Sequence, residues 1–191
     1  MQKVINVIYI IIIVIELFLF KMYNDKKNEE KKEQIESSSI NYILNQGIEY
    51  RKKSDEKNVI NYEMILEIPK INLKKGILSK ADKDNNIDKN ITILEQSSYP
   101  DKVGNIFLAA HSGSGNKSYF NNLVQLKKED EAKLYFNEKI YTYKLQEIRS
   151  IEKNKYITIS TKTNNNLILI TCNQKEKNRF LFFIFTLKAE D

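Results

Sequence analysis

The chain is poor in cysteine, histidine, proline and glycine. Its 191 residues contain one cysteine, one histidine, two prolines and five glycines, with no internal repeat and no tract rich in proline or glycine. A single cysteine excludes an intramolecular disulfide. The Cys172 thiol is therefore either buried and inert or free and reactive.

Positive charge is in modest excess and is not concentrated. Lys and Arg number 31 against 25 Asp and Glu, and the excess is spread along the chain. No basic stripe interleaved with aromatic residues appears, so we interpret the lysines as a solvated surface and expect no nucleic-acid partner.

An apolar segment lies near the amino terminus. Residues 4–20 are nearly all apolar and are interrupted only by Asn6 and Glu16. As a helix they would span about 25 Å, and Lys3 and Lys21 could extend to the two membrane interfaces. The bulky and charged residues that follow offer no small-residue cleavage site. Residues 1–23 are therefore predicted to be an uncleaved signal anchor, a transmembrane helix; a cleaved signal peptide or a buried helix is the alternative.

Two further regions follow this anchor. Residues 24–61 are polar and highly charged, which predicts a partly helical stalk that acts as a spacer and packs in part on the domain. In residues 62–191, short β-rich runs alternate with clusters of Asn, Asp, Gly and Lys, a pattern typical of one all-β barrel or sandwich. Strands are expected at residues 64–68, 90–94, 105–110, 133–136, 140–148, 167–171 and 179–187.

Three shorter segments complete the expected fold. Residues 137–139 form a plausible hairpin turn. The apolar spacing over residues 118–126 predicts a helix that Ser118 could cap. Residues 157–160 fit either a short strand or part of a connection.

Three chemically capable residues are expected at strand ends. Cys172 ends an apolar run, His111 directly follows another, and Arg179 opens the last one. A thiolate attacks carbonyl groups, an imidazole transfers protons near neutral pH, and a guanidinium stabilises an oxyanion. Each residue alone is more often structural. Their joint placement at strand ends of one small domain predicts a cysteine acyl-transfer site.

The motifs around these residues match a known family. The segments LAAHS at 108–112 and LITC at 169–172 precede Arg179, and LEIPKI at 66–71 comes before them. In this order they resemble the sortases, the membrane-anchored cysteine transpeptidases of Gram-positive bacteria, over residues 62–187. The family signature T-L-x-T-C is matched except at Ile168, where it has its first Thr, and Ala110 stands where many members have Gly.

The resemblance implies a fold and a set of roles. It implies an eight-stranded sortase-type β-barrel with short helices, whose groove binds a sorting signal of the L-P-x-T-G type. Cys172 would form a thioacyl enzyme, with His111 as acid and base and Arg179 as the substrate and oxyanion stabiliser. Thr171, together with Ala110 and Ser112 beside the histidine, would support the substrate and oxyanion site. No metal and no cofactor is implied.

The resemblance also implies partners and a location. An amine would resolve the thioacyl enzyme: a peptidoglycan precursor in cell-wall anchoring, or a pilin lysine in pilus assembly. The family places the domain outside the cell membrane with the amino terminus in the cytoplasm, although the lysines after residue 20 would favour the opposite orientation under the positive-inside rule.

Two short segments of the sequence bear on the sortase subclass. The connection 153–166 is too short for the class B insertion, and no Asp-Pro-aromatic lid motif precedes residue 62, which favours a class A-like or D-like enzyme. The acidic residues at 82, 84 and 88 are interpreted as a solvated turn rather than a calcium site. A pilin-polymerising sortase, a cysteine hydrolase that uses water and a catalytically silent peptide-binding barrel remain as alternatives.

Overall fold

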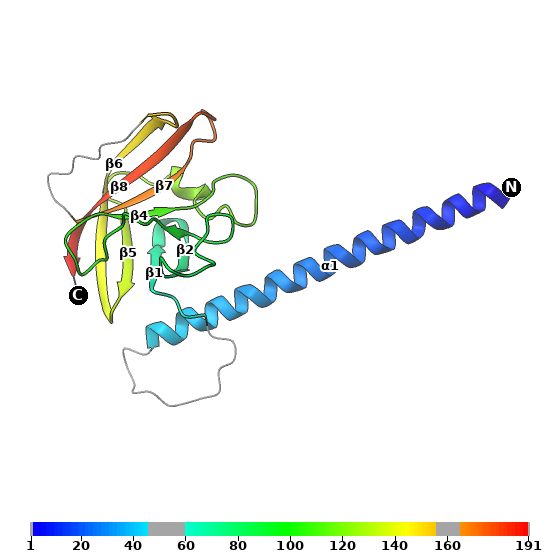
Figure 1. Cartoon of the computed structure of the whole chain (residues 1–191), viewed down its shortest axis with the longest axis horizontal. Helices are drawn as coiled ribbons and strands as arrows, with labels where there is room; N and C mark the ends of the chain where they lie inside the picture. The colour runs from blue at the N-terminus through cyan, green and yellow to red at the C-terminus, as the bar shows by residue number, and fades with distance from the viewer. Residues whose placement is uncertain (1, 46–59, 156–164, 191) are drawn as a thin grey trace.

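One long helix projects from a small β-barrel (Figure 1). The computed structural model describes residues 2–45, 60–155 and 165–190. The helix is α1 (Gln2–Asn45), and two short 3₁₀ helices, η1 (Pro69–Ile71) and η2 (Asn121–Gln125), lie within the barrel domain. The strands are β1 (Met64–Ile68), β2 (Leu73–Ile77), β3 (Thr92–Ile93), β4 (Ile106–Ala109), β5 (Glu131–Phe136), β6 (Lys139–Glu152), β7 (Asn166–Cys172) and β8 (Arg179–Glu190).

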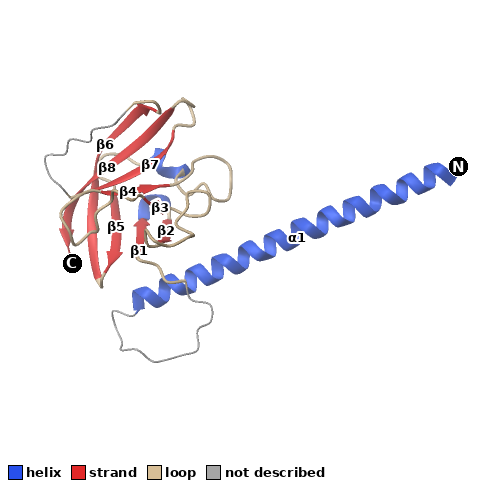
Figure 2. Ribbon diagram, in the orientation of Figure 1, coloured by secondary structure: helices blue, strands red, loops and turns tan. Residues whose placement is uncertain are grey.

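The eight strands form one sheet that curls into a nearly closed barrel (Figure 2). Their order is β2-β1-β5-β6-β8-β7-β4-β3. Every neighbouring pair is antiparallel except β4 and β7, which run parallel. The predicted eight-stranded all-β fold is therefore confirmed.

Most predicted strands are present, with two differences in detail. β2 was not expected, because its sequence LKKGI has two charged residues and a glycine and shows little alternation. It forms as an edge strand that pairs with β1 along its whole length, where its lysine side chains remain accessible to solvent. β6 and β8 pair with each other and continue beyond the predicted ends.

The predicted turn between β5 and β6 is confirmed. Asn137 and Glu138 both have positive φ, 49° and 64°, and they alone separate the two strands. Two consecutive left-handed residues make the turn whose twist matches that of the flanking strands.

The prediction of a helix over residues 118–126 is wrong in the type and the length of the helix. The structure has only the 3₁₀ helix η2, with Phe120 rather than Ser118 at its amino-terminal cap. The two asparagines that begin it favour turns over α-helix, and five residues are too few for tertiary packing to stabilise a full helix. Residues 157–160, the ambiguous segment, lie outside the described residues.

Side chains of β7 and β8 alternate between two apolar clusters. The main cluster fills the barrel and includes Leu167, Leu169, Phe183 and Phe185. The opposite face of the same strands carries a smaller cluster of Ile168, Phe182 and Ile184, against which Phe107, Ile151, Ile170 and Phe180 pack. The register pairs Ile168 with Ile184 and Ile170 with Phe182, so the smaller cluster follows one face of both strands.

The carboxy-terminal part of α1 packs on the barrel. Glu36 accepts a hydrogen bond of 2.8 Å from the ammonium of Lys75 in β2, and the Ser39 hydroxyl accepts one of 3.1 Å from the Ile60 amide. Ser39 and Ile40 are buried there. This end of α1 lies within the predicted stalk, whose bounds stay a prediction.

The surroundings raise the pKa of two tyrosines near this contact. Burial, with the Glu36 carboxylate as the next cause, raises the pKa of both Tyr62 and Tyr119. Both phenols, like an ordinary tyrosine, are protonated at neutral pH, and the upward shift of the pKa means that they lose the proton only at higher pH than usual.

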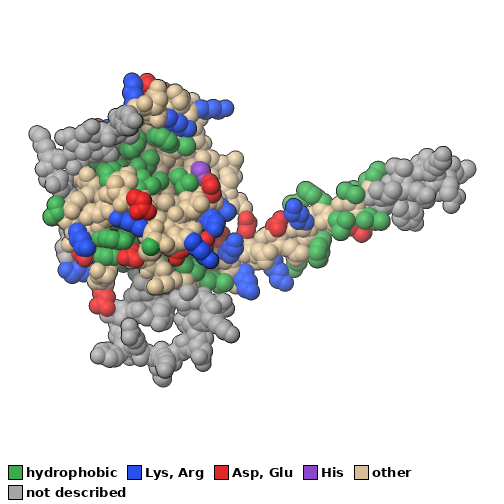
Figure 3. All heavy atoms as spheres, viewed as in Figure 1, with side chains coloured by type: hydrophobic (Ala, Val, Ile, Leu, Met, Phe, Trp, Pro, Cys, Tyr) green, Lys and Arg blue, Asp and Glu red, His purple; other side chains and the backbone are tan. Residues whose placement is uncertain are grey.

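The outer part of α1 carries exposed apolar side chains. Every residue from Ile11 to Phe20 is exposed, and hydrophobic side chains dominate this part of the helix in Figure 3, whereas charged ones gather toward the barrel. Within the described residues, no helix is both long enough and apolar enough to cross a membrane. The predicted boundary between anchor and stalk lies inside this continuous helix and stays a prediction.

Candidate active site

The parallel pairing of β4 and β7 brings Cys172 and His111 together. Ala109 lies opposite Ile170 in the register, and the Ala110 amide donates a hydrogen bond of 3.2 Å to the Ile170 carbonyl. Because the carboxyl ends of parallel strands meet at one edge of a sheet, the residues that follow each strand lie near each other. Cys172 at the end of β7 and His111 just beyond β4 therefore face the same space, as the sequence predicts.

Two side-chain hydrogen bonds hold these strand ends in register. The buried Thr171 hydroxyl donates to the Ala110 carbonyl at 2.9 Å. The Ser112 hydroxyl donates to the Cys172 carbonyl at 2.7 Å. Both bonds join a residue next to the histidine with one at the cysteine. They fix the backbone positions from which the two reactive side chains project.

Substitution of Thr171 by valine is expected to destabilise this junction. Valine has nearly the same shape but no donor, so the buried Ala110 carbonyl loses a hydrogen bond, which costs about 1–3 kcal/mol. Urea unfolding of the full-length chain measures the change in free energy. Thr171→Ser is the matched control, since serine keeps the donor. A Thr171→Val variant as stable as the Thr171→Ser variant would contradict this role.

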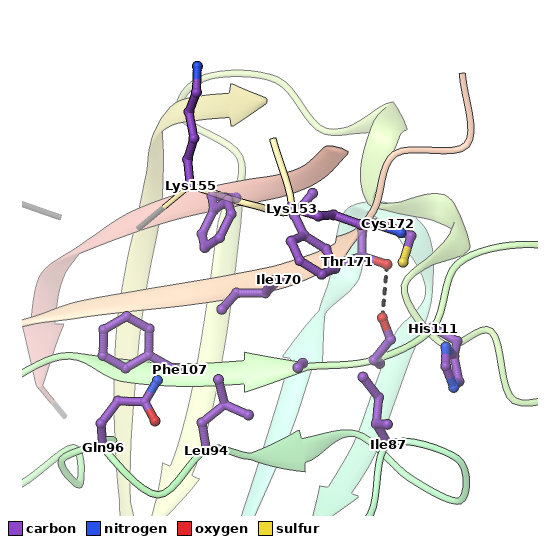
Figure 4. A pocket seen from close by; sticks show the side chains of 14 residues that line it. Ile87, Leu94, Gln96, Phe107, His111, Lys153, Lys155, Ile170, Thr171 and Cys172 are labelled. Carbon is purple, nitrogen blue, oxygen red and sulfur yellow. Dashed lines mark hydrogen bonds between the residues drawn. The ribbon is translucent and has the colours of Figure 1, made fainter. Parts of the chain in front are cut away.

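Cys172 and His111 lie at one end of a pocket of about 710 Å³ (Figure 4). Its walls are mostly apolar and come from β4, β7, β8 and the loops before β4: Ile87, Leu94, Phe107, Ala109, Ile170, Phe180 and Phe182. The other lining residues are Gln96, Ala110, His111, Lys153, Lys155, Thr171 and Cys172. An extended peptide with apolar side chains would suit such a groove, and a carbonyl group bound at its end would lie beside the thiol.

The imidazole of His111 pairs with a carboxylate that lies in a loop. Its Nε2 is 3.0 Å from Oδ1 of Asp88, and the two side chains are 44% and 77% exposed. Cys172 is half-buried. Among the described contacts no hydrogen bond joins the thiol to the imidazole, and Figure 4 shows the ring directed away from the sulfur. Rotation of the His111 side chain would bring a ring nitrogen toward the thiol.

Arg179 lies next to the pocket but does not line it. Its guanidinium, 31% exposed, donates to the hydroxyl of Ser150 at 2.8 Å and to the carbonyl of Ser150 at 2.6 Å. It also forms ion pairs with Glu176 at 3.1 Å and Glu152 at 3.5 Å. The role that the resemblance implies for Arg179 therefore stays a prediction, since in this structure the side chain ties β8 to β6.

Ile168, the departure from the family signature, is fully buried. It packs in the smaller cluster, on the face of β7 that also carries Ile170 and Cys172, and not in the main core of the barrel. Ile168 does not line the pocket, but it belongs to the cluster against which the lining residues Phe107, Ile170 and Phe180 pack. The sequence argument missed Asp88 as the partner of His111, because Asp88 lies in a polar loop that looks like a solvated turn.

Metal ligands are not grouped in the described part of the chain. No three side chains of His, Cys, Asp or Glu lie close enough there to hold a metal ion together. Among the described residues, the lining of the pocket includes a thiol, an imidazole and the side chains of Lys153 and Lys155.

Comparison with known sequences points to one family. A family profile described as Sortase domain matches residues 66–183. Sortase D of Bacillus subtilis is 31% identical over 109 residues, which are 56% of this chain and 52% of that protein. Sortase A of Bacillus anthracis is 28% identical over 118 residues, 62% of this chain and 54% of the other. The chain thus aligns with about half the length of the curated relatives it matches.

Solved structures share the fold. A sortase D5 transpeptidase of Clostridium perfringens superposes with a TM-score of 0.59 at 19% identity, over 82% of this chain and 98% of that one. Sortase C1 of Streptococcus agalactiae does so with a TM-score of 0.58 at 24% identity, over 66% and 67%. The profile match extends over more than half of the sequence, and its limits enclose all strands from β2 to β7. The chain therefore belongs to the sortase family.

Proposed function

We propose that this protein cleaves an L-P-x-T-G-like sorting signal through a thioacyl intermediate on Cys172 and transfers the substrate protein to an amine. The observation that carries the proposal is the placement of Cys172 and His111 at the ends of two parallel strands, at one end of an apolar groove. The relatives named sortase D and sortase A support a class A-like or D-like enzyme.

The first half of the reaction uses both residues. The Cys172 thiolate attacks the carbonyl carbon between Thr and Gly of the signal and forms a tetrahedral oxyanion. The carbon–nitrogen bond then breaks, and the leaving amine takes a proton from the His111 imidazolium. The products are a thioester on Cys172 and a free peptide that begins with glycine.

The second half reverses these roles. The acceptor amine attacks the thioester carbon and gives a proton to the neutral His111 imidazole. The carbon–sulfur bond breaks and restores the Cys172 thiolate. The exposed side chain of His111 leaves room for an external amine, and we propose a peptidoglycan precursor as this acceptor, with a pilin lysine as the alternative.

We also propose that the amino-terminal segment holds the enzyme at the cell membrane, with the barrel outside. The apolar run at residues 4–20 and the exposed apolar side chains from Ile11 to Phe20 support this location, since large exposed apolar surfaces seek a membrane or a partner. A membrane-impermeant maleimide added to intact cells is expected to label Cys172. Labelling that requires lysis would refute the orientation.

A peptide library tests the reaction. The full-length chain in detergent micelles is incubated with peptides that vary around L-P-x-T-G and with triglycine as the amine. Mass spectrometry is expected to detect a product joined at Thr to triglycine, and the released glycine-led fragment. Hydrolysis alone across several amines would make the protein a cysteine hydrolase, and binding without cleavage would make it a peptide-binding barrel.

A further inference from the structure

A tight turn directly after β3 contributes to the pocket on the side away from Cys172. The Ser97 amide donates a hydrogen bond of 2.9 Å to the Leu94 carbonyl, which closes a four-residue turn. Leu94 and Gln96 from this turn line the pocket. In Figure 4 the Gln96 side chain lies at one end of the pocket and Cys172 at the other. A peptide that extends from Cys172 along the groove would therefore meet this turn.

The hydroxyl of one serine attaches the turn to β4. The Ser97 hydroxyl donates a hydrogen bond to the Phe107 carbonyl and accepts one from the Phe107 amide, both at 3.0 Å. Ser97 is buried, and Phe107 itself lines the pocket. Glu95 and Gln96, at the centre of the turn, are exposed. The centre of the turn therefore depends on other contacts for its order.

Lys80 supplies these contacts. It lies just after β2, and its ammonium donates hydrogen bonds to the carbonyl of Glu95, at 3.2 Å, and to the carbonyl of Ser97. These two carbonyls flank Gln96, the residue that reaches the end of the pocket. A hydrogen bond from an ammonium is charge-assisted and is stronger than one between neutral groups. Lys80 therefore ties the centre of the turn to the segment that follows β2.

The Lys80 side chain is itself anchored to the barrel. Its Nζ lies 5.1 Å from the centre of the Tyr99 ring, a cation–π distance. The Tyr99 ring stacks on the ring of Phe136 with their centres 5.4 Å apart, and Phe136 belongs to the main cluster. Lys80 is half-buried as a result. The ammonium is thus held at a fixed place on the core, from which it sets the position of the turn.

We propose that Lys80 is a positioning residue, whose ammonium orders the turn at residues 94–97 and so determines how tightly the groove binds the sorting signal. This inference rests on the proposed binding of the signal in the groove, and it gives Lys80 no part in the chemistry at Cys172. Without the two hydrogen bonds the turn samples other conformations, and the affinity falls by the fraction of molecules that keep the competent one. A loss of this kind raises KM and leaves kcat unchanged.

The first test measures the kinetics of the full-length chain in detergent micelles, with an L-P-A-T-G peptide and triglycine. Lys80→Met keeps a long side chain but removes the donor. It is expected to raise KM about tenfold, with kcat changed less than about twofold, as for a turn that stays ordered in about one molecule in ten. Lys80→Arg is expected to recover most of the affinity, because it restores a cationic donor. Binding of the fluorescein-labelled peptide to the Cys172→Ala chain is expected to weaken by the same factor when Lys80→Met is added.

The second test needs no substrate. The amides of Leu94, Ser97 and Ser98 donate hydrogen bonds to backbone carbonyls, so they exchange slowly with solvent only while the turn is ordered. Hydrogen exchange of a peptic fragment that covers residues 94–98 is followed by mass spectrometry. In Lys80→Met its exchange is expected to accelerate about tenfold, whereas fragments from β7 and β8 keep their rates.

Lys102→Met is the matched control. Lys102 is an exposed lysine at the end of the next turn, and it does not line the pocket. It is expected to leave KM, kcat and exchange unchanged. A Lys80→Met variant with the KM of this control, or one that loses kcat at unchanged KM, would overturn the assignment.

Two further outcomes separate this inference from its alternatives. Faster exchange throughout the barrel of Lys80→Met would show that Lys80 supports overall stability rather than this turn, and would also overturn the assignment. If the wild-type chain neither ligates nor binds the peptide, the proposed function fails. Exchange of residues 94–98 then still decides whether Lys80 orders the turn.

Discussion

Replacement of Cys172 by alanine is expected to lower the rate of transfer at least about ten-thousandfold. The sequence has no second cysteine, so no other thiol can form the thioester. Removal of the attacking group from an enzyme that works through a covalent intermediate leaves only the catalysis supplied by binding and by the oxyanion site. Transfer of an L-P-A-T-G peptide to triglycine, followed by mass spectrometry, measures the loss.

The same variant is expected to fold normally. Cys172 is half-buried at the end of the pocket, and loss of one sulfur atom from such a site costs less than about 1 kcal/mol. Urea unfolding and retained peptide binding provide the control. If the Cys172→Ala variant still transferred peptide within about tenfold of the wild-type rate, the nucleophile would have to be another group.

Replacement of His111 by glutamine is expected to lower kcat about a thousandfold. Glutamine has a similar size and retains hydrogen-bonding groups, but it cannot take up and release a proton near neutral pH. Water would then have to protonate the leaving amine and deprotonate the acceptor amine. The expected loss in kcat lies within the range of about 10²–10⁴ that general acid–base catalysis contributes to a reaction rate. His111 is the only histidine in the chain, so no neighbour can replace it.

Replacement of Asp88, the partner of the His111 imidazole, is expected to lower the rate much less than replacement of His111 itself. Asp88→Asn removes the carboxylate charge 3.0 Å from Nε2 and keeps the side-chain shape. Because both side chains are well exposed, the pair is worth about 0.2–1 kcal/mol, and the rate should fall no more than about fivefold. Asp101→Asn, in an exposed turn away from the pocket, is the control. An Asp88→Asn loss as large as that of His111→Gln would show that the pair acts as a unit.

Local pattern was sufficient to predict the fold class, because strand signals are short-range. Apolar runs bounded by Asn, Asp and Lys predicted seven of the eight strands, and the two-residue turn at Asn137 and Glu138 was expected. β2 could not be predicted, since its order comes from pairing with β1 and not from its own charged sequence. The segment at 118–126 has helical spacing, yet its packing in the barrel leaves only a 3₁₀ turn at Asn121–Gln125.

The candidate site, like the fold, was only partly predictable from the sequence. Cys172 and His111 could be predicted from the sequence because each directly follows an apolar run that had to be a strand. Thr171, Ala110 and Ser112 were expected near them, but their hydrogen bonds across β4 and β7 appear only in the structure. The charged groups of long, flexible side chains, such as those of Lys153 and Arg179, are oriented by contacts with distant segments of the chain.

The sequence by itself determined which residues are capable of chemistry, which family they resemble and that the carboxy-terminal region is an all-β barrel or sandwich. These properties depend on residue identity and short-range order. Only the tertiary structure decided that β4 and β7 are parallel neighbours and that Asp88 pairs with His111. These properties depend on contacts between residues far apart in the chain, and packing selects them among many arrangements that the local pattern permits.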